Sequence, residues 1–105
     1  MKTTFKEENQ KYVMAFEGRL DTAASAQVKK DIEVLENCFG HDIVLDCSAL
    51  EYISSSGLRI FLSVLKNAKS NGSSAIISGL SDDLYEVFDE TGFTQLFDIE
   101  RRKDD

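Results

Sequence analysis

The strongest constraint on the fold comes from two short runs of consecutive apolar residues, IVL at 43–45 and AII at 75–77. Runs without polar alternation are typical of strands that are covered on both faces. The segment between them, residues 55–71, carries Leu58, Phe61 and Leu65 at helical spacing and ends at an Asn-Gly pair. This order of strand, helix and strand favours a parallel pair of strands joined by a crossover helix.

The amino-terminal part of the chain extends this unit. Residues 3–7 and 12–17 favour strands, and the turn formers at 8–10 predict a hairpin between them. Asp21 or Thr22 can cap a helix that runs to about residue 39, where Gly40 ends it. The spacing i, i+4, i+7 and i+11 predicts its inward face, which consists of Val28, Ile32, Leu35 and Phe39.

The carboxyl-terminal part begins with a helix that Ser81 can cap and that Gly92 can end. Residues 94–100 are predicted to form a last short strand or turn, and residues 101–105 a frayed charged tail. The resulting order is ββαβαβαβ. It predicts a single small α/β domain over residues 1–105, with a mixed, mostly parallel sheet and crossover helices.

The acidic composition narrows the classes of function. The chain has 19 Asp and Glu residues against 12 Lys and Arg residues, which gives a net charge of −7. Such a domain repels phosphate backbones and anionic lipids, so we expect neither nucleic acid nor a membrane surface as a partner. No signal peptide or transmembrane run is recognisable, which predicts a cytoplasmic protein whose Cys38 and Cys47 are reduced and half-buried.

A catalytic site is not predicted. His41, the single histidine, precedes the strand at 43–45, whereas the serines at 54–56 follow the far end of that strand. A serine nucleophile needs a base beside it, so we interpret His41 as a solvated loop residue. The chain also lacks a glycine-rich phosphate loop and a cluster of metal ligands, and we therefore expect neither an enzyme nor a cofactor.

The segment SSSG at 54–57 is the candidate functional feature. One serine suffices to cap the helix that follows, so the others are either spare turn residues or exposed hydroxyls. Partners meet α/β domains at the loops after the carboxyl ends of strands, and a helix N-terminus tolerates a phosphate there. Ile60 and Val64 widen the apolar arc of this helix, which either lies deep on the sheet or offers an apolar edge to a partner.

Three segments in this order resemble the STAS domain family, and specifically the bacterial anti-sigma factor antagonists. They are FEGRLDTAASAQV at 16–28, IVLDCSALEYISSSGLRIFL at 43–62 and GLSDDLYEVFDETGFTQLFDI at 79–99. The resemblance covers nearly the whole chain and implies a binding switch. The unphosphorylated protein would bind an anti-sigma factor serine kinase and free a sigma factor, phosphorylation would abolish binding, and a cognate phosphatase would restore it.

The resemblance also implies site residues. Aligned on Gly57, the phosphoacceptor is Ser55, with Ser54 and Ser56 as alternatives, and Ser54 stands where the family has an aspartate. The implied partner-binding residues are Asp21, Ser54, Ser55, Ser56, Gly57, Leu58 and Arg59. Two other functions stay open at this point: a scaffold module of the same family whose serines only cap, and a regulator that binds a small ligand such as a nucleotide.

Overall fold

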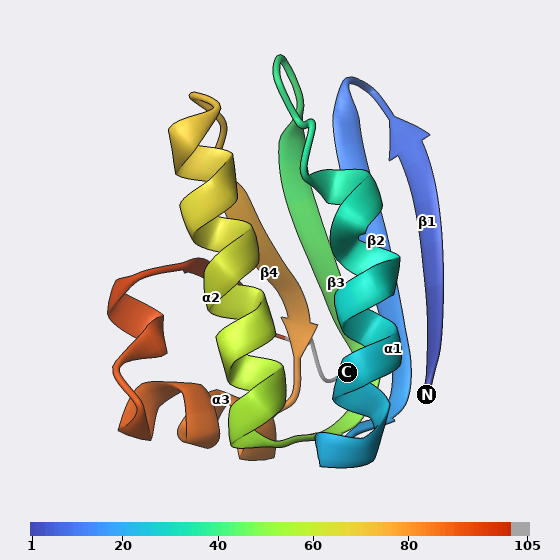
Figure 1. The fold of residues 1–105 in the computed structure, drawn as a ribbon. Helices are drawn as coiled ribbons and strands as arrows, with labels where there is room; N and C mark the ends of the chain where they lie inside the picture. Colours follow the sequence, from blue (N-terminus) through green and yellow to red (C-terminus); the bar gives the residue numbers. More distant parts are fainter. Residues whose placement is uncertain (102–105) are drawn as a thin grey trace.

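The computed structural model describes residues 1–101 and contains one five-stranded sheet in the order β1-β2-β3-β4-β5. β1 pairs antiparallel with β2, and every other neighbouring pair is parallel. The predicted α/β domain and its order ββαβαβαβ are confirmed (Figure 1). The elements are β1 (Lys2–Glu8), β2 (Lys11–Leu20), α1 (Thr22–Asp31), η1 (Ile32–Leu35), β3 (Asp42–Ile53), α2 (Ser55–Ser70), β4 (Ala75–Leu80), α3 (Asp82–Glu90), η2 (Phe93–Gln95) and β5 (Asp98–Arg101).

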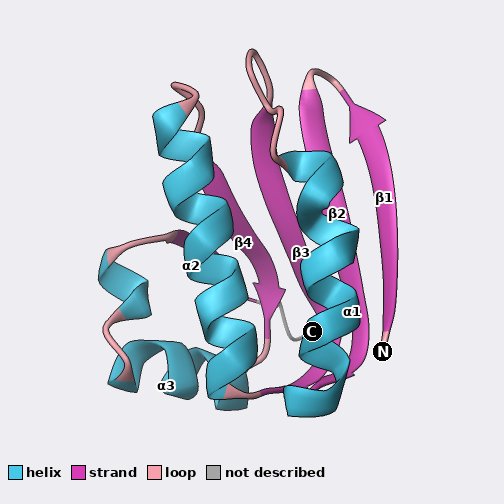
Figure 2. Ribbon diagram, in the orientation of Figure 1, coloured by secondary structure: helices cyan, strands magenta, loops and turns pink. Residues whose placement is uncertain are grey.

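The helices α1 and α2 lie side by side on one face of the sheet (Figures 1 and 2). Alternate residues of β3, including Ile43 and Cys47, face these helices and are fully buried. Phe61 of α2 lies in the middle of the buried layer, with its ring centroid 5.0 Å from that of Phe16 and 6.1 Å from that of Phe88. The core is therefore a single layer between the sheet and the helices.

The opposite face of the sheet carries no helix from the described residues (Figure 1). Val13, Val44 and Ile76 are register partners across β2, β3 and β4, and all three are half-buried. The prediction that these strands are covered on both faces is thus wrong. The apolar runs in the sequence arise instead because aliphatic side chains pack against one another across neighbouring strands.

The first helix is shorter than predicted. α1 ends at Asp31, and the tighter 3-10 turn of η1 buries Ile32 and Leu35. Phe39, predicted for the buried face, is 77% exposed, because the chain leaves the helical path after η1 and buries Cys38 instead. The prediction that the helix reaches residue 39 is therefore wrong.

The turn around Cys38 is held by two hydrogen bonds to its carbonyl oxygen. The backbone N–H of His41 donates at 2.8 Å and the Ser73 hydroxyl donates at 3.0 Å. Gly40 serves this turn with a φ of 82°, rather than ending the helix. Cys38 and Cys47 are fully buried, not half-buried as predicted, because each points into the core beneath the helices.

The second crossover helix lies deep in the helical layer. Leu58, Ile60 and Val64 are 7%, 7% and 4% exposed, so the exposed apolar edge considered from the sequence is wrong. α2 runs between α1 and α3 (Figure 1), and the ring centroid of its Phe61 lies 6.1 Å from that of Phe88 in α3. Leu62 of the same helix is only partly buried.

The last predicted strand forms as β5, after the short 3-10 turn η2. Arg101, predicted to begin the frayed tail, is the last residue of β5, and residues 102–105 of that tail lie outside the described part of the chain. Ser81 caps α3 as predicted, with its hydroxyl oxygen accepting from the Leu84 N–H at 3.3 Å. Within residues 1–101, no helix combines the length and the hydropathy needed to cross a bilayer.

Candidate functional site

The ends of β2 and β3 bring the predicted site residues together. Leu20 and Ile53 are register partners at these ends, and the Ser54 N–H donates a hydrogen bond of 2.8 Å to the Leu20 carbonyl. Asp21 and Ser54 are the next residues of the two strands, and each caps the helix that follows it. α1 and α2 consequently begin side by side at one edge of the sheet (Figure 1).

The capping geometry confirms the local predictions for both residues. An Asp21 carboxylate oxygen accepts from the Ala24 N–H at 2.8 Å, and the Ser54 hydroxyl oxygen accepts from the Gly57 N–H at 3.2 Å. Ser54 is 8% exposed and is the only buried polar residue among the described residues. A neutral hydroxyl therefore does the capping at the position where the resemblance implies an aspartate.

The other two serines are placed differently. Ser55 is the first residue of α2 and is exposed, and its hydroxyl makes no hydrogen bond to any residue in 1–101. Ser56 is half-buried and turns toward α1. The three adjacent serines thus comprise one buried cap, one unpartnered surface hydroxyl and one residue at the junction between the helices.

Gly57 allows the first turn of α2 to lie directly on the strand ends. A Cβ atom at this position would lie 2.8 Å from Ile53 Cγ1 and 2.8 Å from Leu20 Cγ, closer than carbon atoms approach without contact strain. Leu20 Cγ is the branch point of its side chain, Ile53 Cγ1 is bonded directly to Cβ, and both side chains are buried, so neither atom is the far end of a flexible side chain. Any larger residue would therefore push the serines off the edge of the sheet.

The two residues after Gly57 differ in burial. Leu58 is buried in the core, whereas Arg59 is exposed. Of the residues implied as partner contacts, the exposed or half-exposed ones are thus Asp21, Ser55, Ser56 and Arg59. Gly57 and Leu58 fix the position of this surface from beneath.

A groove of about 470 Å³ separates α1 and α2 next to this surface. It is lined by Ser25, Ala26 and Lys29 of α1 and by Ser56, Arg59, Ile60 and Ser63 of α2. Sequence reasoning missed the α1 side of this groove, although Ser25 and Lys29 are one helical turn apart and so share a face. The distance between the two helices could not be read from the spacing within either one.

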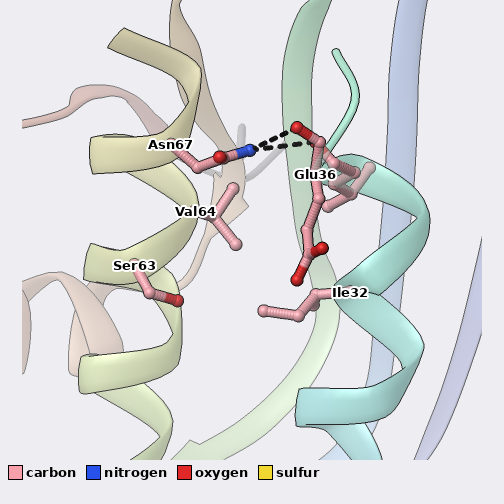
Figure 3. A pocket seen from close by; sticks show the side chains of 6 residues that line it. Ile32, Glu36, Ser63, Val64 and Asn67 are labelled. Carbon is pink, nitrogen blue, oxygen red and sulfur yellow. Dashed lines mark hydrogen bonds between the residues drawn. The ribbon is translucent and has the colours of Figure 1, made fainter. Parts of the chain in front are cut away.

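A smaller pocket of about 130 Å³ continues the α1–α2 boundary beyond Ser63 (Figure 3). There the Asn67 side-chain amide donates a hydrogen bond of 2.8 Å to the Glu36 carbonyl, which links α2 to the residue that follows η1. The Glu36 side chain lines this far end. The groove itself is thus lined by two cations, Lys29 and Arg59, whereas the adjoining smaller pocket is lined by a carboxylate.

A further surface pair that sequence reasoning missed lies beside the strand ends. Arg19 and Tyr52 are register partners on β2 and β3, and the Arg19 guanidinium carbon lies 4.4 Å from the centre of the Tyr52 ring. Tyr52 is 40% exposed. Only the strand register, which the sequence did not supply, brings these two residues into contact.

No base is available to the serines from His41. This residue precedes β3, whereas Ser54 follows it, so the two lie at opposite ends of a strand of 12 residues. His41 is not the solvated loop residue that was predicted, because its Nε2 lies 2.7 Å from a Glu7 carboxylate oxygen and its ring stacks on Tyr12 with centroids 4.1 Å apart. The β1–β2 hairpin thus packs against His41, and the residues of the His41–Glu7 contact are 34 positions apart in the sequence.

The remaining reactive groups do not form a second centre. Burial raises the pKa of the Cys47 thiol, which keeps it protonated and unreactive. Within the described range 1–101, no three metal-ligating side chains lie close enough together to hold an ion. The arrangement at the strand ends can therefore offer a hydroxyl and charged side chains to another molecule, which is the chemistry of a binding surface.

Comparison with known proteins agrees with this architecture. A protein of Listeria monocytogenes named anti-sigma-B factor antagonist is 29% identical over 82 residues, which cover 78% of this chain and 72% of that protein. Among solved structures, an anti-sigma-factor antagonist (STAS) domain protein from Planctomyces limnophilus superposes with a TM-score of 0.85 at 17% identity, over 96% of this chain and 90% of that one.

The phosphorylated form of SpoIIAA from Bacillus superposes with a TM-score of 0.71 at 18% identity, over 93% of this chain and 90% of that one. At these identities the structural matches concern the fold. The STAS domain family model matches residues 2–105, nearly the entire chain. The chain therefore belongs to the STAS domain family.

Proposed function

We propose that this protein is an anti-sigma factor antagonist whose binding is switched by phosphorylation of Ser55. In its unphosphorylated form it binds a kinase-type anti-sigma factor and thereby releases a sigma factor. The Listeria relative carries the name of such an antagonist, which supports this class of function. The observation that carries the proposal is the exposed, unpartnered hydroxyl of Ser55 beside the buried cap Ser54.

The chemical step is a phosphoryl transfer. The kinase passes the γ-phosphoryl group of ATP to the Ser55 oxygen, the hydroxyl proton is released, and ADP leaves. A phosphatase then hydrolyses the phosphate ester with water, which restores the hydroxyl and releases inorganic phosphate. Sigma factors and the ATP used by the kinase are both found in the cytoplasm, so we propose that the protein acts there.

The position of Ser55 favours a switch that changes the surface and leaves the fold intact. A phosphate adds a charge of about −1.5 to −2, and at the start of α2 the helix dipole stabilises negative charge by about 0.3–1 kcal/mol. Because Ser54 does the capping, modification of Ser55 removes no bond from the helix start. SpoIIAA, which shares the fold, is known in unphosphorylated and phosphorylated forms.

The proposed partner surface consists of the implied residues that reach the solvent. Asp21 caps α1, Ser55, Ser56 and Arg59 lie in the first turns of α2, and all four are exposed or half-exposed. A phosphate on Ser55 would place new negative charge at the same edge of the sheet as Asp21 and into any complementary interface. Like charges and desolvation at an interface cost binding energy, so the complex would dissociate.

Mass spectrometry after incubation with the cognate kinase and ATP tests the proposal. The kinase is obtained by capture from the native cytosol on the unphosphorylated protein, followed by identification of an ATP-binding kinase fold. We expect one phosphate on the wild type, none on Ser55→Ala, and one on the neighbouring control Ser56→Ala. Phosphorylation of Ser55→Ala at the wild-type rate would contradict the assignment.

A binding measurement tests the consequence of the modification. Ser55→Glu is expected to bind the kinase at least about tenfold more weakly than the wild type, because a charge then occupies the interface. Ser70→Glu, at the exposed far end of the same helix, is the matched control and should bind like the wild type. Equal affinity of Ser55→Glu and the wild type would favour the alternative of a scaffold whose serines only cap.

A further inference from the structure

The groove between α1 and α2 differs in charge from the rest of the protein. The chain has a net charge of −7, yet the seven residues that line the groove include two cations, Lys29 and Arg59, and no carboxylate. The remaining polar lining consists of hydroxyls on Ser25, Ser56 and Ser63. A local cationic groove in an acidic domain selects for a negatively charged occupant.

The two cations are not used within the protein. Of the arginines in residues 1–101, Arg19 stacks on Tyr52, and Arg101 pairs with Asp82 and lies over Tyr85. Neither Arg59 nor Lys29 makes an ion pair, a hydrogen bond or a ring contact with any residue of that range. Both are exposed and free to pair with an external anion.

Arg59 also borders Ser55. It lies four residues further along α2, so the two side chains are rotated by only about 40° from one another and lie on adjacent turns. Ser56 and Ser63, which line the groove, lie on the other side of Arg59 on the helix surface. Arg59 can therefore reach either an occupant of the groove or a phosphate on Ser55, and one guanidinium cannot pair fully with both.

We propose that the groove binds a carboxylate-bearing segment of the protein partner, held by Lys29 and Arg59, and that phosphorylation of Ser55 releases this segment by recruiting Arg59. This inference rests on the proposed function and names the chemistry of the partner. A groove of about 470 Å³ accommodates a few side chains of a peptide segment. Its lining contains no aromatic ring on which a nucleotide base would stack, which favours an acidic peptide.

The Glu36 carboxylate determines the direction in which the partner segment is expected to lie in the groove. Glu36 lines the smaller pocket beyond Ser63 (Figure 3), so acidic side chains are favoured in the groove and disfavoured in that pocket. Ile60 forms part of the lining and supplies an apolar contact beneath the segment. The expected ligand motif is thus an acidic pair followed by apolar or basic residues.

Charge reversal tests the groove with the kinase as the partner. Arg59→Glu and Lys29→Glu are each expected to weaken binding of the unphosphorylated protein by at least about fivefold, with an effect that shrinks as salt rises. Lys30→Glu makes the same change on an exposed neighbour outside the groove and should stay within about twofold of the wild type. Wild-type affinity in both groove variants, with normal release on phosphorylation of Ser55, would overturn the groove inference and leave the proposed function standing.

A second measurement does not depend on the kinase. Nitrogen-15 amide spectra are recorded during titration with hexaglutamate, and with hexaglutamine as the uncharged control. We expect saturable chemical-shift changes at Ser25, Lys29 and Arg59 with hexaglutamate and none with hexaglutamine. The affinity for hexaglutamate should be lower in Ser55→Glu than in Ser70→Glu. Shifts that are absent, equal for both peptides, or unaffected by Ser55→Glu would overturn the inference, even if the kinase fails to bind and the proposed function falls.

Discussion

The polar side chains at the two ends of β3 differ in whether they have partners within the protein. At the end where the strand begins, His41 pairs with Glu7 and stacks on Tyr12, and an Asp42 carboxylate oxygen accepts from the Ser74 N–H at 3.1 Å. At the end where it finishes, Ser54 caps α2, but Ser55 and Arg59 find no partner among residues 1–101. One end is satisfied internally, and the other leaves exposed groups without a partner among the described residues.

The difference shows how a small domain can give stability and surface exposure to two neighbouring serines separately. The cap needs one hydroxyl oxygen, and Ser54 supplies it from a buried position. Ser55, one residue later, is therefore free of any structural task. A modification at that residue changes the surface at little cost to the fold, whereas the same change at Ser54 would break the start of the helix.

The largest effect on stability is predicted for Gly57→Ala, which disturbs the packing of the first turn of α2 on the ends of β2 and β3. The new Cβ would lie 2.8 Å from Ile53 Cγ1, and we expect overpacking to lower the free energy of unfolding by about 1–3 kcal/mol. Urea denaturation measures this loss. Ser56→Ala, the control in the same turn, should change stability by less than about 0.5 kcal/mol. Wild-type stability of Gly57→Ala would mean that the first turn of α2 is not held against the strands.

The next largest effect is predicted for the two serine caps, Ser54 of α2 and Ser81 of α3, which have the same chemistry. Ser54→Ala and Ser81→Ala each remove a hydroxyl that accepts from the first turn of a helix, and each should cost about 1 kcal/mol in thermal or urea unfolding. Only Ser54→Ala should also slow phosphorylation of Ser55, because only that cap positions the acceptor. Ser54→Asp keeps an acceptor oxygen and should retain stability.

Equal phosphorylation rates in Ser54→Ala and Ser81→Ala would contradict a positioning role for Ser54. A loss of stability in Ser54→Asp as large as that in Ser54→Ala would show that the buried site rejects a charge. The comparison therefore tests whether the hydroxyl in place of the family aspartate serves the helix alone or the acceptor as well.

What could be predicted from the sequence was local. The caps Asp21 and Ser54 depend on hydrogen bonds across three residues, and the order of strands and helices follows from the apolar pattern. The contact of His41 with Glu7 spans 34 residues and depends on how the hairpin packs against the turn before β3. The position of Lys29 in the groove likewise depends on how two helices lie together on the sheet, which neither helix encodes alone.

The end of α1 shows the same limit. The apolar spacing continued to Phe39, but the chain must turn to enter β3, and burial of Cys38 with its two hydrogen-bonded neighbours decides the path. The candidate site was found because its residues are consecutive along α2. Its second wall was missed because it comes from another element.

The smallest effect on stability is predicted for Ser55→Ala, and it gives the sharpest test of the contrast between the two ends. Ser55 is exposed and makes no hydrogen bond within residues 1–101, so its replacement should change the free energy of unfolding by less than about 0.5 kcal/mol while abolishing phosphorylation. His41→Ala is the reciprocal control. It removes a half-buried ring stacked on Tyr12 and should cost about 0.5–1.5 kcal/mol without affecting phosphorylation or kinase binding. If Ser55→Ala were the more destabilising of the two, the hydroxyl would have a structural partner after all, and its availability as an acceptor would no longer follow from the structure.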